Sequence, residues 1–185
     1  GGDALANLIS GDRNFSGRLP FTYPKFINSL ATYDYKPCEQ MGTMEGEYNY
    51  DAVMDIQWPF GHGLSYTQFE YGKVTLDSKE MTQNGKIVLT VPVTNVGKRE
   101  GAEIVQLYIC DKKSSLSRPE KELKGFCKVK LAAGETKTVS FTIDKLSLSF
   151  FDDKQHKWIA EPGKFEAVIA ASAEDIKSKT VFELK

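Results

Sequence analysis

Cysteine is scarce in this sequence of 185 residues, which has three: Cys38, Cys110 and Cys127. The odd number and the lack of any C-x-x-C spacing exclude a full disulfide framework and argue against a structural zinc site. We therefore expect free thiols that behave as small apolar side chains. A Cys110–Cys127 bridge is the alternative, and it requires two strands that bring these residues together.

An excess of one charge and long apolar runs are also lacking. The 24 Lys and Arg and 25 Asp and Glu residues give a formal net charge of −1, which indicates no nucleic-acid partner. The longest apolar stretches, such as Ala167–Ala171, are far shorter than the roughly 20 residues that span a bilayer, so we expect no membrane partner. The chain begins Gly-Gly-Asp with neither Met nor a secretory signal, and we expect that an N-terminal part is missing.

Motifs for catalysis and metal binding are missing as well. The sequence has no H-E-x-x-H, P-loop, G-x-S-x-G or EF-hand pattern. We expect His62, between two glycines, to pack in a turn and His156 to lie on a polar surface turn. Asp152 and Asp153 are adjacent carboxylates, whereas a catalytic pair needs a shared substrate cleft. We therefore predict no catalytic residue, no metal site and no cofactor in this chain.

The composition itself is that of a folded globular protein, with 41% hydrophobic and 26% charged residues. At roughly 150 residues per domain, the length predicts one domain and a remainder. The pattern changes near residue 68, which divides the chain into two unlike parts.

The first part is rich in Gly, Tyr and Pro. Asp3–Ser10 predicts a helix with Asp3 as N-cap and Gly11 as its stop, and its apolar stripe is Leu5, Leu8 and Ile9. Leu19–Tyr23 predicts a short strand. No period holds over Pro24–Pro59, which is too long for an ordinary loop of a compact domain. We expect this segment to be a functional loop or to pack against another part of a larger protein.

The second part alternates apolar and polar residues, which is typical of half-buried antiparallel strands. The alternating runs are Ile87–Thr94, Val105–Ile109, Leu123–Leu131, Thr138–Ile143, Phe165–Ile169 and Val181–Leu184. About seven strands in roughly 117 residues predict a two-layer sandwich of the immunoglobulin or fibronectin type III kind. Asn84-Gly85 predicts a type I′ hairpin, and Pro92 is expected on an edge strand or at a bulge.

Aromatic residues are dense in the aperiodic segment of the first part. Sugar rings stack on such side chains, which makes four residues candidate substrate contacts: Tyr35, Tyr48, Tyr50 and Trp58. Packing against a partner domain explains the same residues, together with Tyr33, and is the interpretation that we favour.

Five motifs, in order along the chain, resemble glycoside hydrolase family 3. They are Gly1–Pro20, Trp58–Phe69, Thr94–Tyr108, Arg118–Phe126 and Glu161–Phe165. The first resembles the end of the family's second domain, the next its connector, and the others its fibronectin type III-like domain. Five collinear motifs make the resemblance specific, although Cys38–Gln57 departs from the family's usual loop.

The resemblance implies a fold that is mainly β, with a fibronectin type III-like β-sandwich over residues 70–185. It implies a short part of an α/β domain over residues 1–60, partly disordered or laid across the sandwich, and a connector over 61–69. Family members are retaining exo-β-glycosidases, most often β-glucosidases or β-xylosidases, that use an Asp nucleophile and a Glu acid/base. In the family both residues precede the region that this chain resembles, so no catalytic residue is carried over.

The expected function is therefore that of a structural module whose partners are the N-terminal barrel and α/β domains of the same enzyme. On this hypothesis the chain alone hydrolyses no glycoside, and the family implies a secreted or periplasmic location. One alternative is a carbohydrate-binding sandwich that takes up a β-linked oligosaccharide, with an aromatic platform drawn from Tyr108, Phe126, Phe151 and Trp158. The other is an adhesion or scaffold module, since fold alone does not decide function.

Overall fold

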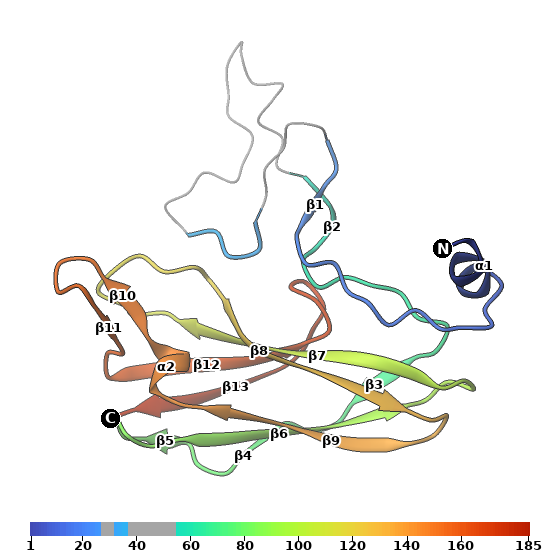
Figure 1. The fold of residues 1–185 in the computed structure, drawn as a ribbon. Helices are drawn as coiled ribbons and strands as arrows, with labels where there is room; N and C mark the ends of the chain where they lie inside the picture. Colours follow the sequence, from blue (N-terminus) through green and yellow to red (C-terminus); the bar gives the residue numbers. More distant parts are fainter. Residues whose placement is uncertain (27–31, 37–54) are drawn as a thin grey trace.

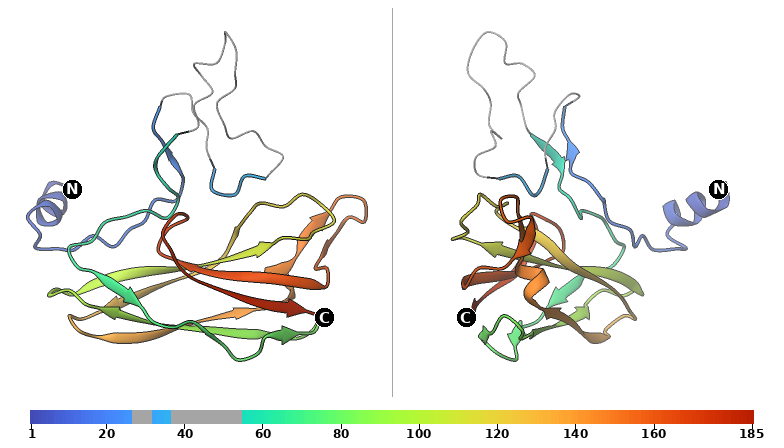
Figure 2. Two further views of the ribbon diagram at one scale, coloured as in Figure 1. Left: turned by 180° about the vertical axis from the view of Figure 1, so that it is seen from behind. Right: turned by 60° about the vertical axis from the view of Figure 1, so that its left-hand side comes forward.

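The computed structural model describes residues 1–26, 32–36 and 55–185. Two sheets lie face to face, and the N-terminal part of the chain runs over the outer face of one of them (Figures 1 and 2). The elements are α1 (Gly2–Ile9), β1 (Tyr23–Pro24), β2 (Ile56–Trp58), β3 (Phe69–Tyr71), β4 (Thr75–Leu76), β5 (Glu80–Met81), β6 (Ile87–Asn95), β7 (Gly101–Asp111), β8 (Glu122–Leu131), β9 (Thr136–Ile143), α2 (Lys145–Leu148), β10 (Phe150–Asp152), β11 (Lys157–Ile159), β12 (Gly163–Ala170) and β13 (Ile176–Leu184).

The first sheet has the strand order β5-β13-β12-β7-β8 in the described part of the chain. Its long strands pair antiparallel, with Phe165 of β12 opposite Phe182 of β13, and Ala167 opposite Ile109 of β7. Only the short β5 pairs parallel, with β13. The strands β12 and β7 lie where the alternating runs predicted strands, which confirms their positions.

The second sheet is built around β6, which pairs with β9 on one side and with β3 and β4 on the other. Pro92 therefore lies on an interior strand, opposite Thr138 of β9, and not on an edge. Its carbonyl accepts a hydrogen bond from the Gly72 N–H at 2.8 Å, in the break between β3 and β4. A residue without an N–H is tolerated there because a regular partner strand is interrupted at this point.

The core fills the space between the sheets, as the period of two requires. Burial alternates along β6, and every second side chain faces inward: Ile87, Leu89, Val91 and Val93. The matching inward side chains of β9 are Val139, Phe141 and Ile143. Each such side chain contributes about 1.5–3 kcal/mol by burial. The predicted two-layer sandwich is confirmed.

The strand β7 departs from the half-buried pattern. Gln106 and Tyr108, on its outward face, are 3% and 0% exposed. A second apolar cluster covers this face and includes Val168 and Ala170 of β12, with Tyr33 and Phe60 packed against it. The outer face of the first sheet is thus a second interface, which strand periodicity alone did not indicate.

Three local predictions in the first part need correction or refinement. The N-cap of α1 is Gly1 rather than Asp3, whereas Gly11 has φ +84° and ends the helix as expected. Of the predicted strand 19–23, only Tyr23 is in a strand, as the first residue of β1. The Leu19 N–H instead donates to the His62 carbonyl at 2.9 Å, and the Gly61 N–H donates to the Leu19 carbonyl at 2.8 Å. Leu19 thus forms backbone hydrogen bonds with the connector instead of pairing in a regular strand ladder.

The predicted type I′ hairpin at Asn84-Gly85 is also wrong. That turn needs positive φ at both central residues, and neither residue has it. The strands on either side, β5 and β6, belong to different sheets, so the turn carries the chain from one layer to the other.

Cys110 and Cys127 are free thiols, as expected. Cys38 lies outside the described residues.

Candidate docking surface

A buried ion pair attaches the N-terminal segment to the sandwich. The Arg18 guanidinium lies 2.8 Å from the Glu103 carboxylate of β7, and the two side chains are 8% and 6% exposed. The same carboxylate accepts the Ile104 N–H at 2.8 Å. Separating the two side chains would leave each buried charge uncompensated, so the ion pair holds the N-terminal segment against β7.

Asn14 forms a second attachment through both ends of its amide. Its Nδ2 donates to Ser65 Oγ at 3.0 Å and to the Glu100 carbonyl at 3.1 Å, while its Oδ1 accepts the Tyr66 N–H at 2.9 Å. The Tyr66 hydroxyl in turn donates to the Leu8 carbonyl at 2.8 Å, at the end of α1. One side chain therefore joins the segment after α1, the connector and the start of β7.

Gln106 holds the connector from the sandwich side. Its Nε2 donates to the Ala171 carbonyl at 2.8 Å and to the Gly61 carbonyl at 3.4 Å, and its Oε1 accepts the Tyr108 hydroxyl at 2.6 Å. Burial raises the pKa of the Tyr108 phenol well above its usual range. Above this network the Tyr33 ring stacks on Phe60, with ring centroids 4.3 Å apart, and meets Tyr108 edge-on.

The opposite side of the N-terminal segment presents exposed apolar side chains. We call this set the docking surface: Phe15, Phe21, Tyr23, Trp58 and Leu64, which are between 38% and 73% exposed. Phe15, Trp58 and Leu64 line one open hollow of about 480 Å³. Tyr23 meets Trp58 edge-on at 5.1 Å and Phe21 at 5.9 Å. Ring contacts and the hollow thus make the surface continuous.

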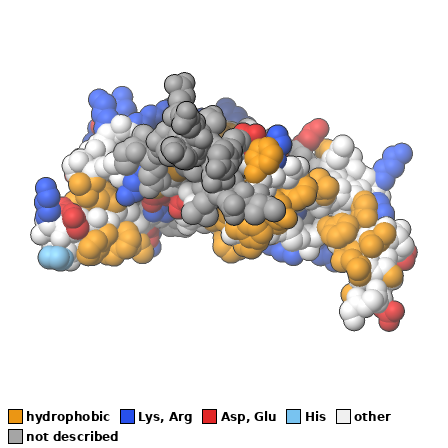
Figure 3. All heavy atoms as spheres, turned by 90° about the horizontal axis from the view of Figure 1, so that it is seen from above, with side chains coloured by type: hydrophobic (Ala, Val, Ile, Leu, Met, Phe, Trp, Pro, Cys, Tyr) orange, Lys and Arg blue, Asp and Glu red, His pale blue; other side chains and the backbone are white. Residues whose placement is uncertain are grey.

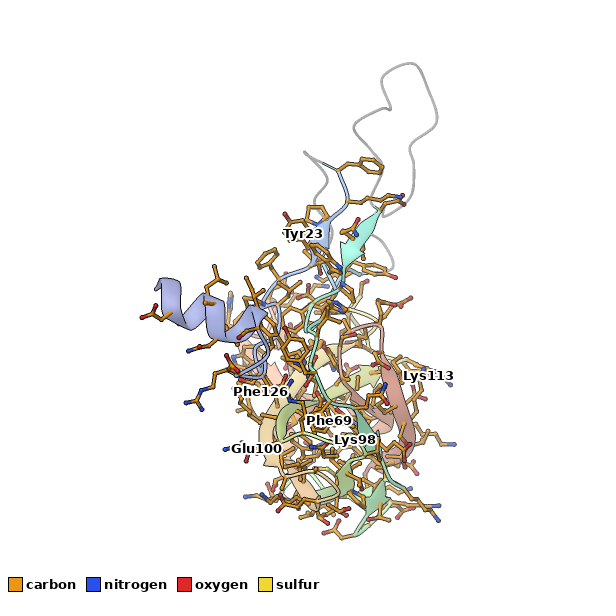
Figure 4. The ribbon with its side chains drawn as sticks, turned by 90° about the vertical axis from the view of Figure 1, so that its right-hand side faces the viewer. Tyr23, Phe69, Lys98, Glu100, Lys113 and Phe126 are labelled. Carbon is orange, nitrogen blue, oxygen red and sulfur yellow. The ribbon has the colours of Figure 1, made fainter. Side chains whose placement is uncertain are left out.

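Helix α1 extends the apolar character of this end of the molecule. None of its eight residues is buried, and its apolar Leu5 and Ile9 are 58% and 68% exposed. Figure 3 shows apolar side chains gathered at the end of the molecule where α1 lies. In Figure 4 the β1–β2 ribbon with Tyr23 rises away from the sandwich that holds Phe69. An amphipathic helix this short is stable when its apolar face is packed against a partner.

The candidate substrate contacts have different surroundings. Trp58 belongs to the docking surface. Tyr35 is half-buried, and burial, with Glu120 beside it, raises the pKa of its phenol. Tyr48 and Tyr50 lie outside the described residues. The sequence analysis did not predict that Phe15 and Leu64 are exposed on this surface, although both lie within motifs that carry the family resemblance.

The remaining polar candidates have ordinary structural settings. The His62 N–H donates to the Pro59 carbonyl at 3.0 Å in a turn, and His156 is an exposed turn residue with φ 51°. Within residues 1–26, 32–36 and 55–185, no group of three or more His, Cys, Asp and Glu side chains is placed to hold a metal ion. Neither described helix has the length and apolarity needed to cross a membrane.

Family models match both parts of the chain. Residues 1–66 match the glycosyl hydrolase family 3 C-terminal domain, and residues 103–173 match a fibronectin type III-like domain. A β-glucosidase of Bacteroides ovatus is 44% identical over 99% of this chain, and a periplasmic β-glucosidase of Salmonella typhimurium is 43% identical over all of it. The chain belongs to glycosyl hydrolase family 3. It covers 26% and 25% of these relatives, so it spans about a quarter of their length.

Solved structures of β-glucosidases contain the same fold. One from Erythrobacter marinus superposes with a TM-score of 0.89 at 33% identity, over 100% of this chain and 24% of that one. One from Listeria innocua, in complex with glucose, gives 0.86 at 31% identity, over 99% and 26%. The resemblance seen in the five motifs is thereby confirmed. Arg18 and Glu103 lie in the two different matches, so their ion pair joins the two matched regions.

Proposed function

We propose that this chain is the C-terminal supporting module of a retaining exo-β-glycosidase that removes terminal β-linked sugars, and that the whole protein is a β-glucosidase. The names of the relatives support glucose as the sugar that is removed, since those of Bacteroides ovatus and Salmonella typhimurium are β-glucosidases. A relative from Formosa agariphila, 40% identical over 97% of this chain and 25% of that protein, is a β-xylosidase. Xylosides are therefore the competing substrate class.

The docking surface carries this proposal. Its exposed aromatic and aliphatic side chains are joined by ring contacts and a shared hollow, so they are contiguous rather than scattered surface residues. The partners that we propose for it are the barrel and α/β domains of the same enzyme. The same segment is fixed to the sandwich by the Arg18–Glu103 ion pair and by the Asn14 hydrogen bond to the Glu100 carbonyl, just before β7, so the sandwich would hold the docking surface in place.

The same proposal includes a division of the chain. Residues 1–60 would complete the α/β domain, residues 61–69 would form the connector, and residues 70–185 would form the sandwich. Gly61 supports the connector, because its φ of +79° is a bend that residues with a side chain adopt at a cost. We also propose that Tyr35, Tyr48, Tyr50 and Trp58 contact the substrate in the whole enzyme. We also propose a secreted or periplasmic location, and the name of the Salmonella relative, a periplasmic β-glucosidase, supports the periplasm.

The direct test is hydrolysis of aryl β-glucosides and aryl β-xylosides. The whole protein that contains this chain should hydrolyse the glucoside faster, whereas the purified 185-residue chain should hydrolyse neither. A mock preparation from cells without the gene controls for contaminating glycosidases. Turnover by the chain above that control would refute its role as a supporting module. A whole protein that prefers the xyloside would refute the proposed β-glucosidase.

A further inference from the structure

A cleft lies at the end of the sandwich away from α1. It has a volume of about 650 Å³ and lies between residues 33–36, residues 116–119 and the β10–β11 hairpin. Figures 1 and 2 show the hairpin and α1 at opposite ends of the molecule. Its lining is mixed, with the apolar Leu116, Phe151 and Trp158 beside the carboxylates of Asp34 and Asp153.

Two aromatic rings form one wall of this cleft. Phe151 of β10 and Trp158 of β11 are directly opposite each other in the hairpin register. Their centroids are 5.8 Å apart and their planes 68° apart, so the rings form an aromatic corner. They are 48% and 60% exposed, whereas the preceding Phe150 is 8% exposed and faces inward. The pleat of the hairpin thus places Phe151 and Trp158 together on its exposed face, while the buried Phe150 also lines the cleft.

The hairpin that carries the corner is held at both ends. In its turn, Asp152 Oδ1 accepts the N–H groups of Lys154 and Gln155 at 2.9 and 3.0 Å. At its base, Arg118 lies over the Phe150 ring and donates to the Leu148 carbonyl at 2.8 Å. The Arg118 side chain is 4% exposed and also pairs with Asp111 and Glu122. The aromatic corner is therefore preorganised, which reduces the entropy that a ligand must overcome.

We propose that this cleft binds a neutral pyranose chain such as a β-glucan. A pyranose has apolar C–H faces and equatorial hydroxyls, and it needs aromatic faces beside hydrogen-bond acceptors. The Phe151–Trp158 corner supplies the aromatic faces, and Asp34 and Asp153 supply carboxylate acceptors. The site is separate from the docking surface, so it is free of the contacts proposed there and stands independently of them.

Affinity electrophoresis of the 185-residue chain tests the proposal. Gels are cast with soluble mixed-linkage β-glucan, xylan or xyloglucan, and a gel without polysaccharide gives the reference mobility. The chain should be retarded by the β-glucan. Phe151→Ala and Trp158→Ala should each weaken binding roughly fivefold to tenfold, as expected for the loss of one aromatic stacking contact. Phe126→Ala is the matched control, because Phe126 on β8 is 69% exposed and does not line the cleft.

A fluorescence titration gives a second measurement that does not depend on the alanine variants folding. The chain has two tryptophans, so Trp58→Phe leaves Trp158 as the single reporter. Soluble β-glucan oligosaccharides should change its emission in a saturable way. Unchanged mobility in every gel would overturn the proposal. Retardation that persists in both folded alanine variants, or binding with no change in Trp158 emission, would place the sugar elsewhere and overturn it too.

Discussion

Arg18 and Glu103 form an ion pair of 2.8 Å although 85 positions separate them in the sequence. Arg18 belongs to the match with the family 3 C-terminal domain, and Glu103 is the first residue of the fibronectin type III-like match. With the hydrogen bonds of Asn14 and Gln106, the pair binds the two regions to each other at several points. We infer that the N-terminal segment and the sandwich behave as one mechanical unit.

The ion pair should be costly to break on one side. Arg18→Met leaves the Glu103 carboxylate buried without its partner, and we expect the free energy of unfolding to fall by roughly 3 kcal/mol. The double variant Arg18→Met with Glu103→Leu should recover part of that loss, because no unpaired charge is left. Urea unfolding of the unchanged chain and the two variants measures both effects. Equal losses in the single and double variants would show that the charge itself is not responsible.

Gly61 should tolerate no side chain. A Cβ there would lie 2.5 Å from the Gln106 amide nitrogen, in addition to the strain of φ +79°. We expect Gly61→Ala to reduce the free energy of unfolding by about 2–4 kcal/mol. Gly134→Ala is the matched control, since Gly134 has φ +76° and open space at the Cβ position. It should lose only about 1 kcal/mol, and thermal melts that show equal losses would contradict the predicted clash.

Asp144 should make the stability of α2 depend on pH. The Ser147 N–H, which donates to Asp144 Oδ1 at 3.0 Å, holds the pKa of this carboxyl below its ordinary value of 3.8. The folded state therefore favours the ionised form, and this stabilisation is present above pH 3.8 and is lost as the pH falls through the lower folded pKa.

Removal of the cap tests this directly. Asp144→Ala should reduce the free energy of unfolding by about 1 kcal/mol at neutral pH, and by less once the pH has fallen below the lowered folded pKa of this carboxyl. Asp144→Asn keeps an acceptor without the titrating group, so it should retain most of the stability and lose the pH dependence. Denaturant unfolding at the two pH values measures each difference. A loss in Asp144→Ala that does not change with pH would exclude the carboxylate as its source.

Leu64 should matter only when the rest of the enzyme is present. It is 73% exposed in this chain, and we expect Leu64→Asp to leave the stability of the 185-residue chain almost unchanged. In the whole protein the same change should cost about 2 kcal/mol or more, because a buried apolar contact becomes a charge. Leu146→Asp on α2, where the leucine is 67% exposed, is the matched control and should have no effect in either form. Equal effects of both substitutions in the whole protein would contradict the docking surface.

The long strands of the sandwich were predictable because each has its own local signal, whereas the short β3, β4, β5, β10 and β11 were not predicted. Ile87, Leu89, Val91 and Val93 fill every second position of β6, and β-branched residues favour extended backbone. The long strands in the second half of the chain can therefore be assigned from the alternation of apolar and polar residues. The family motifs were readable for a similar reason, since glycines such as Gly11 occupy positions that need positive φ.

The interface between the two parts had no such signal. Gln106 and Tyr108 were expected on a half-exposed strand face, but Tyr33 and Phe60, far away in sequence, cover that face. The predicted strand over Leu19–Tyr23 failed for the same reason, because Leu19 bonds to the connector instead of a neighbouring strand. Pairing between distant segments depends on which surfaces come into contact in the fold, and the alternation of residues along one strand does not specify those contacts.

The sequence alone determined the sandwich class, the positions of the long strands and the family, because alternation and collinear motifs are properties of local residue order. Tertiary structure decided that Arg18 meets Glu103, that the first sheet is covered on its outer face, and that Phe151 and Trp158 form an exposed corner. It also decided which apolar residues stay uncovered at the docking surface. The physical reason is that burial depends on contacts between segments far apart in the chain, which local patterns do not specify.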